Sequence, residues 1–310
     1  MDKHIPVMLN EVIDNLNIKE NGIYVDCTLG RAGHSSEILK RIPNGHLYGL
    51  DQDKKAIEES GSFLSTIGSN YTLIHTNFIN VKEKLSELGI TKVDGILMDL
   101  GVSSPQFDDG ERGFSYRYDA RLDMRMNREN NLDAHYIINN YSLNELTKIF
   151  REYGEEKYAY NIAKNIVKSR ESKAINTTFE LVNIIKISLP PKELSKKGHP
   201  AKQVFQALRI ETNHELDYLT KVLDDVLSML NIGGRLAIIT FHSLEDRIVK
   251  KAFKSVSEIE GNRHSPMMLS KEKTMPSYKL VNRQVIVASE EELKINPRSQ
   301  SAKLRIIERI

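Results

Sequence analysis

Residues 23–33 read IYVDCTLGRAG, a short β-rich run followed by a glycine-bearing turn and then by a helical segment. The run 23–28 has the composition of a buried strand, and Gly30 and Gly33 interrupt it before an apolar-periodic helix. Because glycine has no Cβ, such a turn allows the backbone to approach a ligand closely. A strand that leads directly into a helix predicts the first half of a βαβ unit.

The same alternation of strand and helix signals continues along the chain. A helical stripe at 210–230 ends at the glycines of NIGG, and SLED at 243–246 predicts a capping box for a helix over 247–253. Right-handed βαβ units build a mostly parallel α/β sheet, and its ligands bind at the carboxyl ends of the strands. The further predicted strands are 46–51, 71–75, 93–99, 235–241, 278–287 and 302–308.

About a hundred residues between the fourth strand and the 210–230 helix exceed what a plain sheet needs. They read as helices, with capping signals at Ser142 and at Thr177 or Thr178, and with Pro190-Pro191 ending the third helix. We therefore expect a catalytic domain made of 1–107 and 211–310. An inserted helical subdomain, 108–210, would follow directly behind the stretch DLGVSSPQFD and sit over the mouth of the site.

Polar residues end several of the predicted strands and suggest a small ligand rich in hydroxyl groups. Asp51 lies 21 residues after Gly30, where an acid typically accepts both ribose hydroxyls of an adenosine. Phe78 follows the third strand and could stack on an adenine, and Asp99 ends the fourth. The loop lacks a complete G-x-G-x-x-G motif, which favours S-adenosylmethionine over NAD. A purely structural turn is also open at this point.

Composition excludes several other classes of protein. The chain has 310 residues, 40% of them apolar and 28% charged, and no apolar window long enough for a membrane helix. The single cysteine, Cys27, excludes internal disulfides and cysteine-based metal centres, and the nine histidines show no metal-binding spacing. We expect a cytoplasmic protein with no membrane partner and no metal.

Charge is segregated along the chain although the total is only +2. Residues 1–107 carry a net charge of −4 and 108–210 one of +4, while 211–246 carry −5 and 247–310 carry +7. Two basic blocks of this kind would suit contact with a polyanion. Solvated helical faces explain the same pattern about equally well. A non-catalytic RNA-binding protein is therefore an alternative to an enzyme.

Long blocks of sequence along nearly the whole chain are similar to one known family. The chain resembles the bacterial 16S ribosomal RNA cytosine-N(4) methyltransferases, which act on a decoding-centre cytosine of the small ribosomal subunit. These blocks are HIPVMLNEV, DCTLGRAGHS, DGILMDLGVSSPQFDDGERGFSYRYDARLDMRMN, YGEEKYA, HPAKQVFQALRIETNHEL, GGRLAIITFHSLEDRIVK and NPRSQSAKLRIIER.

The resemblance implies a Rossmann-like class I methyltransferase fold whose helical insertion recognises the substrate. It also implies S-adenosyl-L-methionine as the cofactor and 16S rRNA of the small subunit, rather than DNA, as the partner. A homodimer is left open. The implied cofactor contacts are Ala32, Gly33, His34, Asp51, Phe78, Asp99 and Gln106. The family usually has glycine where this chain has Ala32, a substitution that costs stability if the position requires a positive φ.

The polar loop after the fourth strand has a chemical interpretation in this setting. An exocyclic cytosine amine is a poor nucleophile, so an enzyme must hold acceptors beside its hydrogens while it attacks the sulfonium methyl group. We expect Ser103 and Ser104 to supply hydroxyl or carbonyl acceptors, with Pro105 stiffening the loop. Asp99 would hold the donor's amino group or, as the alternative, accept the proton.

Further residues are candidates for contact with RNA. His242 follows the fifth strand and could face the target base, or it could serve as a helix-entry residue. Four arginines are interleaved with aromatic residues, a pattern that suits phosphate contacts and base stacking. Asp119 and Asp123 lie between them, so local salt bridges are the rival interpretation. The four are Arg112, Arg117, Arg121 and Arg125.

Overall fold

The computed structural model describes residues 5–102, 107, 109–258 and 276–310 of the chain. These residues form two compact units, one made of Met1–Gly101 with Asp217–Ile310 and the other of Val102–Leu216. The insertion predicted at 108–210 lies within the sequence limits of the second unit. Among the described residues, no helix is both long and apolar enough to cross a membrane.

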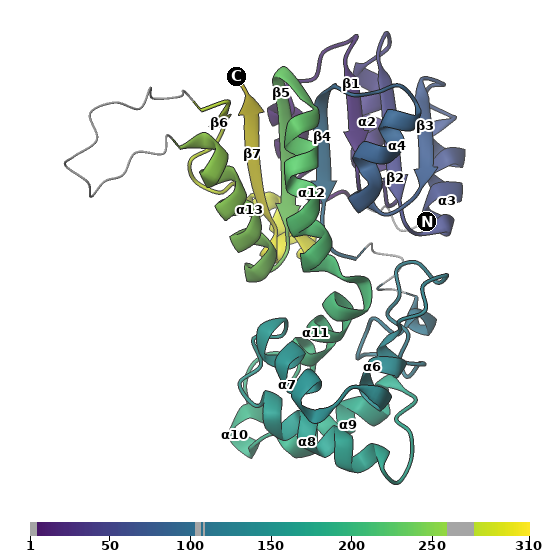
Figure 1. The fold of residues 1–310 in the computed structure, drawn as a ribbon, viewed down its shortest axis with the longest axis vertical. Helices are drawn as coiled ribbons and strands as arrows, with labels where there is room; N and C mark the ends of the chain where they lie inside the picture. Colours follow the sequence, from purple (N-terminus) through teal and green to yellow (C-terminus); the bar gives the residue numbers. More distant parts are fainter. Residues whose placement is uncertain (1–4, 103–106, 108, 259–275) are drawn as a thin grey trace, which may run out of the picture. The chain divides into compact units, whose positions relative to one another are not determined.

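The first unit is built on one seven-stranded sheet with the order β3-β2-β1-β4-β5-β7-β6 (Figure 1). Strands β1 to β5 are parallel, whereas β7 runs antiparallel to both β5 and β6. The predicted mostly parallel α/β sheet is thus confirmed. The strands are β1 (Ile23–Asp26), β2 (His46–Asp51), β3 (Tyr71–His75), β4 (Val93–Asp99), β5 (Leu230–Thr240), β6 (Tyr278–Leu280) and β7 (Lys303–Arg309).

The order of the sheet reverses at β1, which pairs with β2 on one side and with β4 on the other. The register places Asp26 opposite Gly49 of β2 and Leu97 of β4, two residues before each of those strands ends. The last residues of β1, β2 and β4 therefore gather at the point where ligands of such sheets bind.

Helices pack on both faces of this sheet through two separate apolar clusters. Alternate strand residues belong to different clusters, as Val25 and Tyr24 of β1 do, because successive side chains point to opposite faces. One cluster includes side chains of α4 (Val81–Glu87), α12 (Glu215–Met229) and α13 (Ser243–Ser257). The other includes side chains of α1 (Leu9–Asn15), α2 (Gly33–Arg41) and α3 (Lys54–Leu64). The remaining short elements are η1 (Phe78–Asn80), α14 (Glu290–Ile295) and η3 (Pro297–Ser301).

The second unit is helical and has an apolar core of its own. Both predicted capping boxes are present, with Ser142 before α7 and Thr177 before α9. Helix α9 ends at Ser188, just before the Pro190-Pro191 pair, as expected. Its elements are η2 (Gly110–Arg112), α6 (Ala134–Asn140), α7 (Leu143–Glu152), α8 (Ala159–Arg170), α9 (Thr178–Ser188), α10 (Pro191–Leu194) and α11 (Lys202–Asn213).

Four sequence predictions need correction. The strand expected at 278–287 is shorter, because β6 ends at Leu280 and Ile286 forms an isolated bridge with Leu304. The helix expected at 210–230 is interrupted by His214, which has a φ of 52° and separates α11 from α12. Strand β5 begins at Leu230 rather than 235, because Leu230 pairs with Val93 before the register shifts between Val93 and Gly95 of β4. Helix α13 is capped by His242 instead of Ser243, with Glu245 completing the box.

Candidate active site

The turn after β1 is joined to the end of β2 by hydrogen bonds. The Gly30 N–H donates to Asp51 Oδ2 at 2.8 Å, and the Asp53 N–H donates to Asp51 Oδ1 at 2.8 Å. Gly30 has a φ of 52°, and its carbonyl accepts from the Ser60 hydroxyl at 2.8 Å. Each Asp51 oxygen retains acceptor capacity for a ligand hydroxyl after these bonds are made.

The Asp51 carboxyl group is enclosed by protein although part of the residue is accessible. Burial raises its pKa to about 6, and the backbone bonds from Asp53 and Gly30 only partly oppose this effect. Asp51 therefore changes its charge in the mildly acidic range, where an ordinary aspartate is already ionised.

Ala32 and Gly33 begin helix α2 directly after the turn. Ala32 is fully buried and has φ 58° and ψ 27°, the left-handed conformation that favours glycine. The condition under which this alanine costs stability is thus met, at about 1–2 kcal/mol. A Cβ on Gly33 would lie 2.3 Å from Pro6 Cγ, so the missing side chain accommodates the N-terminal segment.

His34 connects that N-terminal segment to the turn. Its Nε2 lies 2.9 Å from the Val7 carbonyl oxygen, which can only accept, so Nε2 carries the proton in this bond. Its Nδ1 lies 3.8 Å from Asp99 Oδ2, which is longer than a hydrogen bond. The ring is 5% exposed, and these contacts agree with a role in shaping the cofactor loop.

Asp99, the last residue of β4, has a carboxyl group with a raised pKa. Its N–H donates to Thr28 Oγ1 at 2.6 Å, which joins the ends of β1 and β4. Its Oδ1 is buried and has no hydrogen-bond partner among the described residues. Burial, with the negative charges of Asp26 and Glu245, raises the pKa of Asp99 well above its ordinary value. A buried acceptor left in this state indicates that a ligand donor belongs there.

Two buried acids at this site were not among the sequence candidates. Asp26 is 2% exposed and accepts hydrogen bonds from the Ser35 hydroxyl at 2.7 Å and the Thr28 N–H at 3.1 Å. Burial also raises the pKa of Asp26. The signal was available, because Asp26 ends its strand as Asp51 and Asp99 end theirs.

Glu245 is the second of these acids, and only the structure reveals its position. It is 2% exposed and accepts from the N–H groups of Phe241 at 2.8 Å and His242 at 3.3 Å. The His242 Nδ1 accepts from the Glu245 N–H at 3.5 Å, while its Nε2 lies 3.1 Å from Glu245 Oε1. These contacts fit the helix-entry interpretation of His242, and its contact with a target base stays a prediction.

The remaining predicted cofactor and catalytic residues follow β3 and β4. Phe78 opens the short helix η1 after β3 and packs partly buried against one of the two sheet clusters. The preceding Asn77 fixes this corner by donating to Gln52 Oε1 at 2.7 Å. The predicted residues Ser103, Ser104, Pro105 and Gln106 lie outside the described residues.

These features together fit S-adenosylmethionine. Three carboxyl groups with raised pKa values suit a ligand that carries a positive sulfonium and an ammonium group. The acceptor capacity of Asp51 suits ribose hydroxyls, and the Oδ1 of Asp99, which has no partner among the described residues, suits an ammonium donor.

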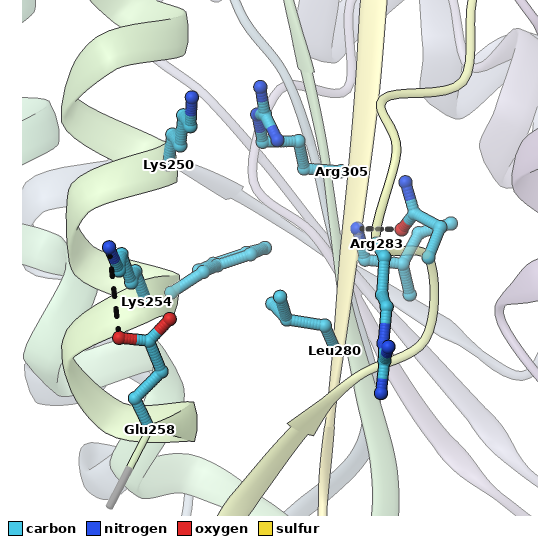
Figure 2. A pocket seen from close by; sticks show the side chains of 9 residues that line it. Lys250, Lys254, Glu258, Leu280, Arg283 and Arg305 are labelled. Carbon is cyan, nitrogen blue, oxygen red and sulfur yellow. Dashed lines mark hydrogen bonds and ion pairs between the residues drawn. The ribbon is translucent and has the colours of Figure 1, made fainter.

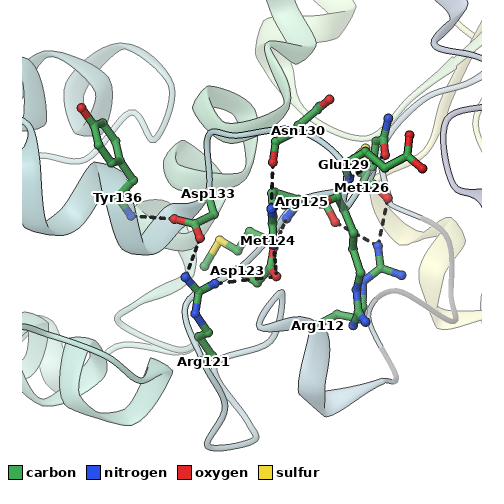
Figure 3. Close-up of polar contacts among 12 residues, drawn as sticks. Arg112, Arg121, Asp123, Met124, Arg125, Met126, Glu129, Asn130, Asp133 and Tyr136 are labelled. Atoms are coloured by element: carbon green, nitrogen blue, oxygen red, sulfur yellow. Dashed lines mark hydrogen bonds and ion pairs between the residues drawn. The ribbon is translucent and has the colours of Figure 1, made fainter.

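The predicted RNA-binding arginines lie in the second unit, and three of them make contacts within it (Figure 3). Arg112 is 6% exposed and donates to the carbonyls of Arg125 at 2.9 Å and Met126 at 3.0 Å. Arg121 pairs with Asp133 at 2.7 Å. The structure therefore supports local contacts for Arg112 and Arg121, and any contact with RNA stays a prediction.

Arg125 and Arg117 differ in their surroundings. Arg125 makes a two-pronged bond to Asp123, with Nε at 2.7 Å and a terminal nitrogen at 2.9 Å, and also donates to the Asn130 carbonyl. The exposed Arg117 has no side-chain hydrogen bond or ion pair within the part of the chain that the structure describes. Of the four, Arg117 is the one whose guanidinium can meet a phosphate without breaking an internal bond.

The sheet order, the glycine-bearing turn after β1 and the acids that end β1, β2 and β4 define a Rossmann-like methyltransferase. Residues 1–310 match the model of the MraW methylase family, and the chain belongs to that family. S-adenosylmethionine is the cofactor of this class of enzyme, which confirms the predicted methyl donor and disfavours NAD.

Curated relatives match over their full lengths. A Ribosomal RNA small subunit methyltransferase H from Mesoplasma florum is 52% identical over 310 residues, covering 100% of both chains. The protein of the same name from Clostridioides difficile is 50% identical over 309 residues and 99% of both chains. A solved rRNA methylase from Streptococcus thermophilus has 13% identity and a TM-score of 0.39, over 98% of this chain and 92% of that one.

Proposed function

We propose that the protein transfers a methyl group from S-adenosylmethionine to the exocyclic N(4) amine of a decoding-centre cytosine in 16S rRNA. Relatives that share about half of its residues over their whole lengths are named as small-subunit ribosomal RNA methyltransferases, which supports the substrate. The resemblance noted in the sequence supports the cytosine amine. The observation that carries a ligand-binding role is the buried Asp99 Oδ1 without a partner among the described residues.

The cofactor would lie across the ends of β1, β2 and β4. Asp51 would accept hydrogen bonds from the ribose hydroxyls, and Phe78 would lie against the adenine. Ala32, Gly33 and His34 would form the turn around the methionine part, with Gln106 as a further contact implied by the resemblance. Asp99 would accept a hydrogen bond from the donor's ammonium group, whose positive charge favours the ionised carboxylate.

When bound, S-adenosylmethionine supplies an activated methyl group, so the protein's task is to orient and activate the amine. Ser103, Ser104 and Pro105 lie four to six residues after Asp99, which ends β4. Their hydroxyl or carbonyl oxygens would accept hydrogen bonds from the amine so that its nitrogen turns tetrahedral during attack. Asp99 is the alternative proton acceptor, because its raised pKa makes it a stronger base than an ordinary aspartate.

The second unit and the start of α13 would contact the RNA. The exposed Arg117 would pair with a phosphate, and Arg112, Arg121 and Arg125 would mainly hold the loop that presents it. His242 would face the target base from the end of β5. The enzyme must also extract the cytosine from its stack before transfer.

The test is methyl transfer from labelled S-adenosylmethionine to small ribosomal subunits that lack the modification. The modified nucleoside is then identified by mass spectrometry. Label on the cytosine N(4) amine is the expected result. Label on another base or on the ribose would refute the substrate assignment. Cofactor binding without any transfer to subunits would refute the proposed substrate as a whole.

A further inference from the structure

A pocket lies in the first unit, between helix α13 and the strands β6 and β7. Its volume is about 240 Å³. Figure 2 shows Lys250 and Lys254 projecting from α13 on one side, with Arg305, Leu280 and Arg283 on the other. None of its lining residues is a predicted cofactor, catalytic or RNA contact.

Positive charge dominates the lining of this pocket, with four cationic side chains against one acid, Glu258. Lys254 lies 3.7 Å from Glu258, and Arg305 forms an ion pair with Asp246 at 2.7 Å. The other two cations, Lys250 and Arg283, are exposed and have no ion-pair partner within the described ranges. No described residue neutralises these two charges, so an anion from outside would meet them.

The back of the pocket is apolar. Phe253 is 1% exposed and Ile306 is fully buried, so both support the wall without offering a face for base stacking. An apolar wall lowers the local dielectric and strengthens the attraction between the cations and an anion. Among the residues that the structure describes, this lining combines cations that have no ion-pair partner with no exposed aromatic ring. This combination suits phosphate groups, which carry no sequence information, rather than bases.

The chain also concentrates positive charge in this region. Residues 247–310 carry 14 basic and 7 acidic residues, a net charge of +7, and all nine residues lining the pocket belong to this block. The pocket is smaller than the 300–1,000 Å³ typical of complete small-molecule ligands. It would hold one or two phosphates of a chain that continues beyond it.

We propose that this pocket binds the phosphodiester backbone of the RNA substrate, through Lys250 and Arg283, away from the methylated base. The inference rests on the proposed function, because it assumes an RNA substrate. Each cation would neutralise about one phosphate and release its counterion, so binding through the pocket depends on salt. The contact adds affinity and orientation while leaving the methyl-transfer chemistry unchanged.

The test compares the double variant Lys250→Ala/Arg283→Ala with wild type in binding to unmodified small subunits and to protein-free 16S rRNA over a range of KCl concentrations. Loss of two phosphate contacts should reduce the slope of log K against log salt by about 1.4 to 1.8. The KM for subunits should rise, while kcat and the Kd for S-adenosylhomocysteine stay unchanged. The control Lys221→Ala/Lys251→Ala removes two exposed lysines of the same unit outside the pocket.

Each outcome decides one question. If log K falls with log salt equally steeply for the pocket variant and the control variant, the pocket does not bind phosphates, even when the wild type is fully active. A wild type that transfers no methyl group would instead refute the proposed function, while the binding slopes still decide the pocket. If the pocket variant bound assembled subunits more weakly but protein-free RNA normally, the pocket would contact a ribosomal protein, and its assignment to the RNA backbone would be overturned. Lys250→Arg/Arg283→Lys should restore the slope, which excludes a folding defect as the cause.

Discussion

Binding of S-adenosylhomocysteine, the cofactor product, is expected to weaken below pH 6 because of Asp51. The ionised carboxylate accepts hydrogen bonds from the ribose, whereas the protonated acid offers less acceptor capacity. With a pKa of about 6 for Asp51, the apparent Kd should rise by up to about tenfold for each pH unit below that value, the limit being reached if only the ionised form binds. At pH 5 this corresponds to about 1.4 kcal/mol of lost binding free energy.

The stability of the free protein should change in the opposite direction. The pKa of Asp51 is higher in the folded state than in the unfolded state, so its stabilising contribution is complete below about pH 4 and is lost as the pH rises through 6. The loss is at most about 3 kcal/mol by pH 7. The rise in Tm that the ligand produces should therefore grow between pH 5 and pH 7.

Isothermal titration calorimetry of wild type and of Asp51→Asn between pH 5 and pH 8 checks this reasoning. Both Asp51 oxygens accept backbone N–H groups, and asparagine has one acceptor oxygen, so the variant should bind more weakly and lose the step near pH 6. Asp53→Asn keeps the N-cap of α3, removes the same charge and should retain the step. A wild-type affinity that stays constant from pH 5 to pH 8 would refute the assignment of Asp51.

Three further predictions concern single substitutions. Ala32→Gly should remove about 1–2 kcal/mol of left-handed backbone strain from the folded state, while the greater entropy of the unfolded chain costs about 0.4–1 kcal/mol. Urea denaturation should therefore show an equal or slightly higher free energy of unfolding. A clear loss of stability would contradict the strain at this position. Asp99→Asn should stabilise the free protein at pH 8 by removing a buried carboxylate, yet weaken S-adenosylhomocysteine at least tenfold in calorimetry. Unchanged affinity would count against the ammonium contact. Gly113→Ala should destabilise the protein by more than about 2 kcal/mol, because φ is 71° and the new Cβ would lie 2.3 Å from the Arg121 carbonyl. Its control is Gly89→Ala, which has a φ of 77° but no atom within 4 Å of the new Cβ, and a cost equal to that control would contradict the clash.

Local signals in the sequence were sufficient for much of the fold. Strands β1 to β4 coincide with the β-rich runs of the sequence, each of which is followed by a turn signal. The capping boxes at Ser142 and Thr177 begin the helices that they predicted. These features depend on side chains and backbone groups a few residues apart, so composition and spacing determine them. The acids Asp51 and Asp99 were found for the same reason, because each ends such a run.

Distant contacts decided the rest. The early start of β5 depends on pairing between Leu230 and Val93, and the positive φ of Ala32 lies in a turn packed against Pro6 and Val7. The burial of Glu245 beneath the Phe241–His242 turn likewise needs the packed sheet.

The sequence by itself determined most of the helices and strands of this protein, its family resemblance and the acids that end its strands. The tertiary structure alone decided which of those acids are desolvated, which arginines are used internally and where the cations Lys250 and Arg283 gather. The physical reason is that a residue's charge state and its free hydrogen-bonding capacity depend on neighbours far away in the chain. Those neighbours are specified only when the chain is folded.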